Sequence, residues 1–265
     1  MIKMIDGIIA IDAHVHVHPL GRKRYGKFPV LTPPEMLLEE MDRNGFDKAV
    51  IVNAGSVVPE LMRENNDYVS EVVKKWPNRF IGFAGICPLL GSVAIEELER
   101  AVNVLGLKGI KLYPPHGYPI DSPIVFPIVE KAISLNIPIV IHSDFQSLFC
   151  NPYQIARLAS LYPEATLIMA HMGMHPDLFL LTPEIVKPYN NIVLDTSGTP
   201  ECPEITFVYS IRELGVDRIV FGSDALYFDQ ALALKKLERA KERWGLTEEE
   251  KRHILGENMA RILRI

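Results

Sequence analysis

Histidines at the ends of apolar segments are the main chemical signal in this sequence. His14 and His16 are two residues apart in IDAHVHV, and residues at this spacing project from the same face of a strand. Three further ligand-type residues each end an apolar run, namely His142 in IVIHSD, His171 in LIMAHMG and Asp224 in VFGSD. Imidazole nitrogens and a carboxylate suit zinc, iron or manganese, and a set without cysteine favours a catalytic site over a closed structural one.

Eight apolar or β-branched segments would have to position these side chains. They span residues 7–17, 48–54, 79–88, 107–114, 137–144, 166–173, 191–198 and 218–225. Most are continuously apolar, which is typical of strands covered on both faces, as in a parallel sheet.

The segments between these runs carry helix signals. Residues 32–35 (TPPE) offer a capping threonine, a proline for the first turn and a glutamate three residues after the cap, and Gly45 closes the helix. Thr247 opens the last helical region in the same way, and Gly256 is expected to interrupt it. Pro127 would remove an interior hydrogen bond from the helix expected before the fifth strand.

Strict strand–helix alternation over the whole length predicts an α/β fold with a parallel sheet. Eight units favour a closed (β/α)8 TIM barrel of the metal-dependent hydrolase type, since no glycine-rich dinucleotide loop follows the first strand. We expect residues 1–265 to form one catalytic domain. In such a barrel the C-terminal strand ends converge on one mouth, so the five candidate ligands would meet there.

Composition narrows the functional classes. A net charge of −5 gives no support for nucleic-acid binding, and 48% apolar residues exclude a disordered chain. No apolar run approaches the ~18 residues that cross a bilayer, and the N-terminus lacks a signal-peptide pattern, so we expect a cytoplasmic protein without membrane contact. Cys87, Cys150 and Cys202 are widely spaced and are expected to be buried apolar side chains.

A structural role is the usual explanation for a single histidine at a strand end. Five ligand-type groups at equivalent strand ends argue against that explanation. A metal-binding or scaffold protein that keeps the barrel without activity is the non-enzymatic alternative.

Several of these segments resemble the amidohydrolase superfamily: IDAHVHVHP, GIKLYPP, IVIHSD, MAHMG, FGSDA and LGENMARIL. As a set they are most similar to the amidohydrolase-related branch that includes aminocarboxymuconate-semialdehyde decarboxylase-like enzymes. The resemblance runs from the first strand to the final helix. It implies a divalent metal, with zinc expected, held by His14, His16, His142 and Asp224. It also implies that His171 is either a second-metal ligand or a catalytic residue that polarises the substrate.

Lys111 ends the fourth strand in GIKLYPP, which looks like the corresponding stretch of dihydroorotases. In binuclear members of the superfamily a lysine there is carboxylated and bridges two metals. The alternative is an unmodified lysine that pairs with a carboxylate or holds an anionic substrate, so one or two ions per chain stay open. A TatD-type nuclease is disfavoured, because that family places a glutamate at this position.

We expect a metal-dependent hydrolase that acts on a small amide, lactone or ester through metal-activated water. Asp224 would move the proton of that water, and His171 or a metal would polarise the carbonyl. The alternative is a non-oxidative decarboxylase of an aromatic or unsaturated acid, in which His171 steers a proton to the carbon. In both cases the partner is a small molecule, anionic for the decarboxylase; assembly into a homo-oligomer stays open.

Other residues past the strand ends carry weaker signals. Surface or supporting roles are expected for His18, His116 and His175, while Tyr113, Asp144 and Tyr227 could contact substrate or only pack, and Asp12 has no assigned role. A basic cluster follows the first strand and contains Arg22, Lys23, Arg24 and Lys27. It is expected either to be a solvated surface or to bind an anionic group of the substrate.

Overall fold

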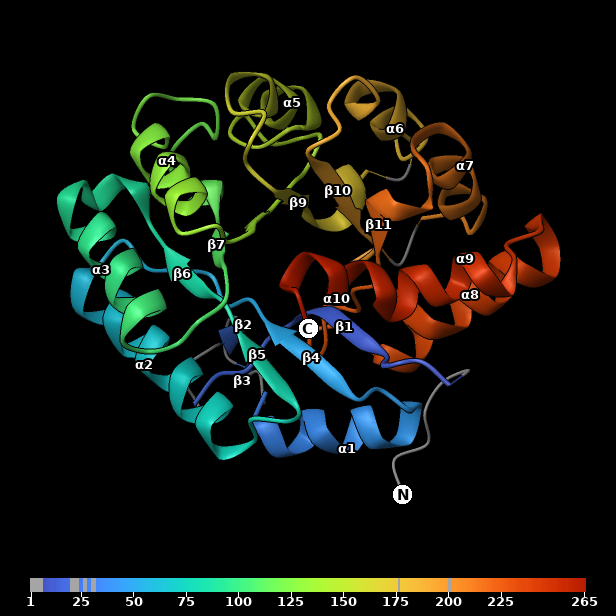
Figure 1. The fold of residues 1–265 in the computed structure, drawn as a ribbon, viewed down its shortest axis with the longest axis horizontal. Helices are drawn as coiled ribbons and strands as arrows, with labels where there is room; N and C mark the ends of the chain where they lie inside the picture. Colours follow the sequence, from blue (N-terminus) through green and yellow to red (C-terminus); the bar gives the residue numbers. More distant parts are fainter. Residues whose placement is uncertain (1–6, 20–23, 26–27, 30–31, 176, 200–201) are drawn as a thin grey trace.

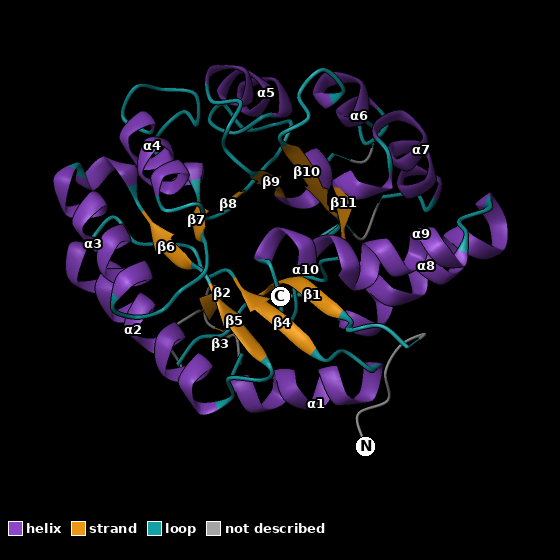
Figure 2. Cartoon of the chain, in the orientation of Figure 1, coloured by secondary structure: helices purple, strands orange, loops and turns teal. Residues whose placement is uncertain are grey.

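Short parallel strands form a ring that helices surround (Figure 1; Figure 2). The computed structural model describes residues 7–19, 24–25, 28–29, 32–175, 177–199 and 202–265. The strands of the ring are β1 (Ile11–Val15), β4 (Lys48–Ile51), β5 (Phe80–Gly82), β6 (Ala84–Ile86), β7 (Ile110–Leu112), β8 (Ile139–Ile141), β9 (Leu167–Met169), β10 (Ile192–Asp195) and β11 (Ile219–Val220). A short antiparallel pair, β2 (Arg24–Tyr25) and β3 (Phe28–Pro29), lies apart from it.

Backbone hydrogen bonds carry the pairing around the whole ring. β1 pairs with β4 and β4 with β5, and β6 to β11 pair in chain order, all parallel. Phe83 separates β5 from β6, and its amide donates to the Ile51 carbonyl at 2.9 Å. The ring closes because the Ala13 amide donates to the Phe221 carbonyl at 2.8 Å. β5 and β6 thus occupy one strand position, and the predicted (β/α)8 barrel is confirmed.

Helices cover the ring, most of them on its outside, and bury their apolar faces against it (Figure 2). They are α1 (Pro34–Asn44), α2 (Pro59–Lys75), α3 (Ser92–Asn103), α4 (Phe126–Ser134), α5 (Pro152–Leu161), α6 (Leu181–Val186), α7 (Ile205–Leu214), α8 (Gln230–Trp244), α9 (Glu248–Arg252) and α10 (Asn258–Leu263). A second core fills the barrel interior, where Phe83, Val140 and Ile168 pack with Met259 of α10. No helix in the described part of the chain is long and apolar enough to cross a membrane.

The predicted helix ends are partly right. Gly45 ends α1 in the left-handed conformation, and Thr247 forms the predicted capping box with Glu250. Thr32 is not the cap of α1: Pro33 occupies that position without a side-chain hydrogen bond. Pro127 lies in the first turn of α4, where a missing amide hydrogen costs no interior hydrogen bond.

Gly256 interrupts the α-helix of the last helical region, as expected, although the backbone stays helical there. It lies in a π-helical turn, His253–Glu257, between α9 and α10. A Cβ atom at Gly256 would lie 1.9 Å from the Ile9 carbonyl oxygen, so glycine allows this turn to pack against the backbone before β1. As expected, Cys87, Cys150 and Cys202 are buried, and none of them forms a disulfide.

Candidate metal centre

A cavity of about 850 Å³ opens at the C-terminal ends of the strands. Its lining includes all six residues singled out as candidate ligands or catalytic groups: His14, His16, Lys111, His142, His171 and Asp224. They come from β1 and the residue after it, from β7, and from the segments after β8, β9 and β11. The barrel therefore brings together side chains that are far apart in the sequence, because parallel strands end at one face.

Three of these side chains form a compact group. The ligand atoms of His14, His16 and Asp224 all lie within 4.8 Å of one another, and all three residues are buried. Asp224 Oδ1 lies 2.8 Å from His16 Nε2 and 3.6 Å from His14 Nε2. One carboxylate oxygen thus faces two imidazole nitrogens, a donor set that fits a divalent metal.

The surroundings of His14 and Asp224 favour the protonation states that bind a metal. Burial and the nearby Lys111 lower the pKa of His14 well below its usual value, so the ring is neutral. Burial alone would raise the pKa of Asp224, but the hydrogen bond with His16 and the nearby imidazoles lower it well below its usual range. A neutral imidazole and an ionised carboxylate are the forms that coordinate metal.

Backbone shape brings Asp224 close to the histidines. Asp224 has a φ of +66°, a left-handed conformation that non-glycine residues seldom adopt, and its amide donates to the His14 carbonyl at 2.9 Å. A Cβ atom at Gly198 would lie 2.8 Å from both Asp224 Oδ2 and His171 Nδ1. At Gly222 it would lie 2.1 Å from Asp195 Oδ1. Glycine at these two positions lets the backbone lie directly against the site.

Asp195 and Ser197 contact the histidine rings on the side away from the cavity, and our sequence reasoning missed both. Asp195 Oδ2 lies 2.5 Å from His14 Nδ1, and Ser197 Oγ lies 3.0 Å from His14 Nδ1 and 3.0 Å from His171 Nδ1. Burial raises the pKa of Asp195 to about 6. One feature of the sequence could have indicated Asp195. It is a carboxylate at the end of the apolar segment IVLD, and ligand histidines commonly bond a carboxylate through their second ring nitrogen.

His171 and His142 stand beside the compact group. The His171 ring centroid lies 5.0 Å from that of His14 and 4.8 Å from that of His142, and Tyr113 packs against His142 at 4.9 Å. Burial lowers the pKa of His171 to about 3 and that of His142 well below its usual value. The structure thus places both rings at the cavity in the neutral state, although His142 does not belong to the three-residue group.

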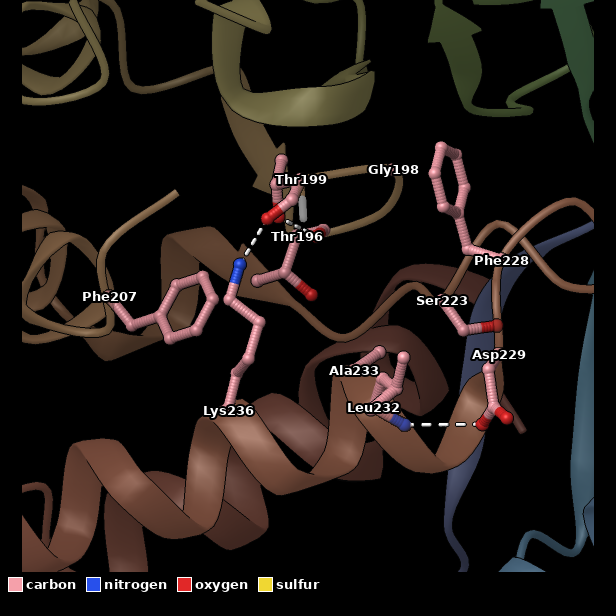
Figure 3. Close-up of a pocket in the computed structure, with 10 residues that line it drawn as sticks. All are labelled: Thr196, Gly198, Thr199, Phe207, Ser223, Phe228, Asp229, Leu232, Ala233 and Lys236. Atoms are coloured by element: carbon pink, nitrogen blue, oxygen red, sulfur yellow. Dashed lines mark hydrogen bonds between the residues drawn. The ribbon is translucent and has the colours of Figure 1, made fainter. Parts of the chain in front are cut away.

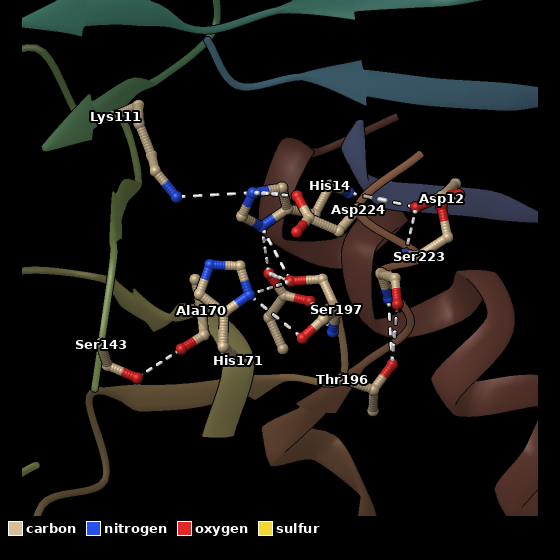
Figure 4. Close-up of polar contacts among 12 residues, drawn as sticks. Asp12, His14, Lys111, Ser143, Ala170, His171, Thr196, Ser197, Ser223 and Asp224 are labelled. Carbon is tan, nitrogen blue, oxygen red and sulfur yellow. Dashed lines mark hydrogen bonds and ion pairs between the residues drawn. The ribbon is translucent and has the colours of Figure 1, made fainter. Parts of the chain in front are cut away.

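Lys111 points into the cavity from β7. Its side chain is buried with 2% exposure, and its Nζ lies 3.4 Å from His14 Nε2 (Figure 4). Among the described lining residues it contributes the alkylammonium group, next to histidines whose pKa values are lowered.

Tyr227 and His18 line the rim of the same cavity. The Tyr227 ring stacks on His16 with centroids 4.6 Å apart, and its hydroxyl lies 2.8 Å from His18 Nε2. His116 and Tyr113 also line the cavity. His175 and Asp144 are not among the described lining residues; each bonds a backbone amide two residues ahead.

Asp12 lies deeper in the barrel and holds the segment before Asp224. Its carboxylate accepts hydrogen bonds from Ser223 Oγ at 2.5 Å, from the Ser223 amide at 3.0 Å and from Gln230 Nε2 at 2.8 Å. Burial raises the pKa of Asp12 to about 7, against the lowering effect of these hydrogen bonds.

A smaller pocket of about 60 Å³ lies next to the cavity (Figure 3). Phe228 borders both spaces, and Lys236 donates to the Thr199 carbonyl across the pocket.

The predicted basic cluster lies outside the described residues. This holds for Arg22, Lys23 and Lys27, and for the side chain of Arg24.

Comparison with known proteins agrees with this geometry. The amidohydrolase family model matches residues 11–265. A gamma-resorcylate decarboxylase from a Polaromonas species is 25% identical over 91% of this chain and 97% of its own length. A 2-amino-3-carboxymuconate-6-semialdehyde decarboxylase from Dictyostelium discoideum is 30% identical, but the match spans 41% of this chain and only 33% of that protein.

A solved structure gives the same fold. The 5-carboxyvanillate decarboxylase of Novosphingobium aromaticivorans, with bound manganese, has a TM-score of 0.81 at 16% identity and is covered over its full length. These comparisons correct one expectation. The prediction of a hydrolase of amides, lactones or esters is wrong, because the relatives that match most of the chain are decarboxylases. The predicted role of Asp224 in moving a proton from hydrolytic water depended on hydrolysis, so we do not keep that role.

Proposed function

We propose that this chain, which belongs to the amidohydrolase family, is a metal-dependent decarboxylase of an aromatic or unsaturated carboxylic acid. One observation carries the proposal: a buried lysine lies beside a His–His–Asp group in a cavity large enough for a small aromatic acid. The decarboxylase activity of the relative that matches 91% of the chain supports it.

The compact group fits a divalent metal. His14, His16 and Asp224 supply two imidazole nitrogens and one carboxylate oxygen within 4.8 Å. The ring of His171 lies beside that of His14, and the ring of His142 lies beside that of His171. A bound divalent ion would neutralise and fix the negatively charged oxygens of the substrate. The donor set suits zinc, which we expected from the sequence, as well as the manganese held by a solved relative.

Lys111 would bind the substrate carboxylate. Its ammonium group lies inside the cavity, and the neighbouring histidines have lowered pKa values and are neutral. Lys111 Nζ lines the cavity beside His14, where a substrate carboxylate could accept a charge-assisted hydrogen bond from it. We therefore favour an unmodified Lys111 over a carboxylated one.

His171 would carry the proton that replaces the departing group. In the reaction the bond from the substrate carbon to the carboxylate breaks, carbon dioxide leaves and the electron pair stays on that carbon. A proton must then reach the carbon. His171 is neutral in the free protein, so its Nε2 would receive a proton from solvent and pass it on, rather than store one.

Carbon dioxide release tests the proposal. Protein loaded with manganese or with zinc is incubated with 2,6-dihydroxybenzoate, 5-carboxyvanillate and related aromatic and unsaturated acids, and carbon dioxide is measured directly. We expect release from at least one acid, and loss of that release when the metal is removed. Elemental analysis of the purified protein separates zinc from manganese and one ion from two. A fully loaded protein that releases no carbon dioxide from any acid would overturn the proposal.

A further inference from the structure

Ser197 lies between two histidines that belong to different strands. Its Oγ is 3.0 Å from Nδ1 of His14, in β1, and 3.0 Å from Nδ1 of His171, after β9. Ser197 itself follows β10, and all three residues are buried. One hydroxyl oxygen therefore contacts the rear nitrogen of both rings (Figure 4).

The hydroxyl hydrogen of Ser197 takes part in a hydrogen bond to Asp195. Ser197 Oγ donates to Asp195 Oδ2 at 2.9 Å, and a hydroxyl has one hydrogen to give. Toward the two imidazoles Ser197 Oγ can therefore only accept. His171 Nδ1 also lies 3.1 Å from the Ser197 carbonyl, which is an acceptor as well. Favourable contacts at these positions require a hydrogen on Nδ1 of both rings.

This tautomer leaves the opposite nitrogen of each ring with its lone pair. For His14 that nitrogen is Nε2, which lies 3.6 Å from Asp224 Oδ1 and 3.4 Å from Lys111 Nζ, at the cavity. A metal ligand or a proton acceptor needs this lone pair, and the partner of the other ring nitrogen decides where it lies.

The position of Ser197 is fixed by its surroundings. Its amide donates to Asp195 Oδ1 at 2.8 Å. A Cβ atom at Gly222 would lie 2.9 Å from the Cβ of Ser197 and 2.9 Å from that of His14. The hydroxyl is thus held by hydrogen bonds on one side and by close backbone packing on the other.

We infer that Ser197 is a positioning residue that couples His14 to His171: it favours the Nδ1-protonated tautomer of His171, supports with Asp195 that of His14, and fixes the relative orientation of their cavity-facing nitrogens. This inference rests on the proposed metal site, but not on decarboxylation. Without the hydroxyl, His14 keeps Asp195 and His171 keeps one carbonyl, so the barrel stays folded while the two rings lose their common partner.

Metal affinity and imidazole tautomers test the inference without any substrate. Chelator competition gives the dissociation constant for manganese in wild type, in Ser197→Ala and in the control Thr199→Val. Thr199 belongs to the same loop, is also buried, and donates only to the Thr196 carbonyl among the hydrogen bonds described for its hydroxyl. We expect Ser197→Ala to weaken metal binding roughly 10- to 100-fold, as is typical for partners of ligand histidines. Thr199→Val should stay close to wild type.

Long-range ¹H–¹⁵N spectra of the metal-free protein should show a hydrogen on Nδ1 of both rings in wild type, and a mixture of tautomers for His171 in Ser197→Ala. Equal metal affinity in the two variants, or an Nε2-protonated ring in wild type, would overturn the inference. If Ser197→Ala does not fold, the wild-type spectra decide alone. A response of affinity and tautomers in a protein that decarboxylates no acid would leave this inference standing and remove only the proposed function.

Discussion

His16 Nε2 and Asp224 Oδ1 lie 2.8 Å apart, although the two residues come from opposite ends of the chain. The contact occurs where the barrel closes, between β1 and the loop after β11. It lies at the mouth and not within a strand, so changing either side chain should alter the site without removing barrel pairing.

His16→Ala should lower metal content while the barrel stays folded, because the change removes one donor of the compact group. We expect a loss of affinity beyond the roughly 10- to 100-fold that removal of a supporting partner costs. Elemental analysis and circular dichroism check the two parts. His18→Ala is the matched control, since His18 contacts Tyr227 and is not in the group. Full metal content in His16→Ala would refute the ligand assignment.

Lys111→Met should raise KM for carboxylate substrates by about tenfold or more, since a hydrogen bond to a charged group contributes roughly 1.5–3 kcal/mol. Lys111→Arg keeps the charge and should lose less. Metal content should persist in both variants. Inhibition by a neutral analogue of the substrate should be equal in wild type and Lys111→Met. Intact-protein mass spectrometry supplies a separate check: an added carbon dioxide on Lys111 would contradict the unmodified ammonium.

Tyr227 separates a stacking effect from a hydrogen-bond effect. Tyr227→Phe keeps the ring that stacks on His16 and removes the hydroxyl that contacts His18 Nε2. Tyr227→Ala loses both. We expect metal affinity to fall in Tyr227→Ala by about 0.5–1.5 kcal/mol, the usual value of an aromatic pair, and to change little in Tyr227→Phe. Equal losses in the two variants would show that the hydroxyl, not the ring, supports His16.

Arg218 should stabilise the fold and not the chemistry. Its guanidinium is buried and donates to carbonyls of Val186 and Tyr189, at and after the end of α6, and to that of Ile192. Arg218→Met should lower the free energy of unfolding by about 3 kcal/mol or more, since several buried carbonyls lose their partner. Arg261→Met, which removes one exposed bond to the Asp217 carbonyl, is the control. Chemical denaturation measures both, and similar small losses would contradict the role of Arg218.

Asp12 should make the stability of the metal-free protein depend on pH. Burial raises its pKa from 3.8 to about 7 in the folded protein. The folded state therefore retains a proton that the unfolded chain has released, and this contribution is fully present below pH 3.8 and lost as pH rises toward about 7. Relative to wild type, Asp12→Asn should become more stable across that window, by roughly 1.4 kcal/mol per pKa unit. A constant difference between the two proteins from pH 4 to 7 would contradict the shift.

The barrel could be predicted because buried parallel strands appear in the sequence as short, continuous apolar runs. Continuous apolar runs such as IPIVI and the alternation with helix signals give the fold class without any tertiary contact. Helix ends were predicted where the signal is local, as at Gly45 and Thr247, and the cap at Thr32 failed because Pro33 can take the same position.

The sequence by itself also determined which of the candidate side chains line the cavity. His14, His16, His142, His171 and Asp224 end strands, and a parallel barrel brings strand ends to one mouth. Asp195, Ser197 and the positive φ of Asp224 could not be read in this way. Their roles depend on distances of about 3 Å between different strands, and the close packing of Gly198 and Gly222 decides those distances. The tertiary structure alone therefore decided which histidines share a partner, and why Lys111 faces His14 and not the solvent.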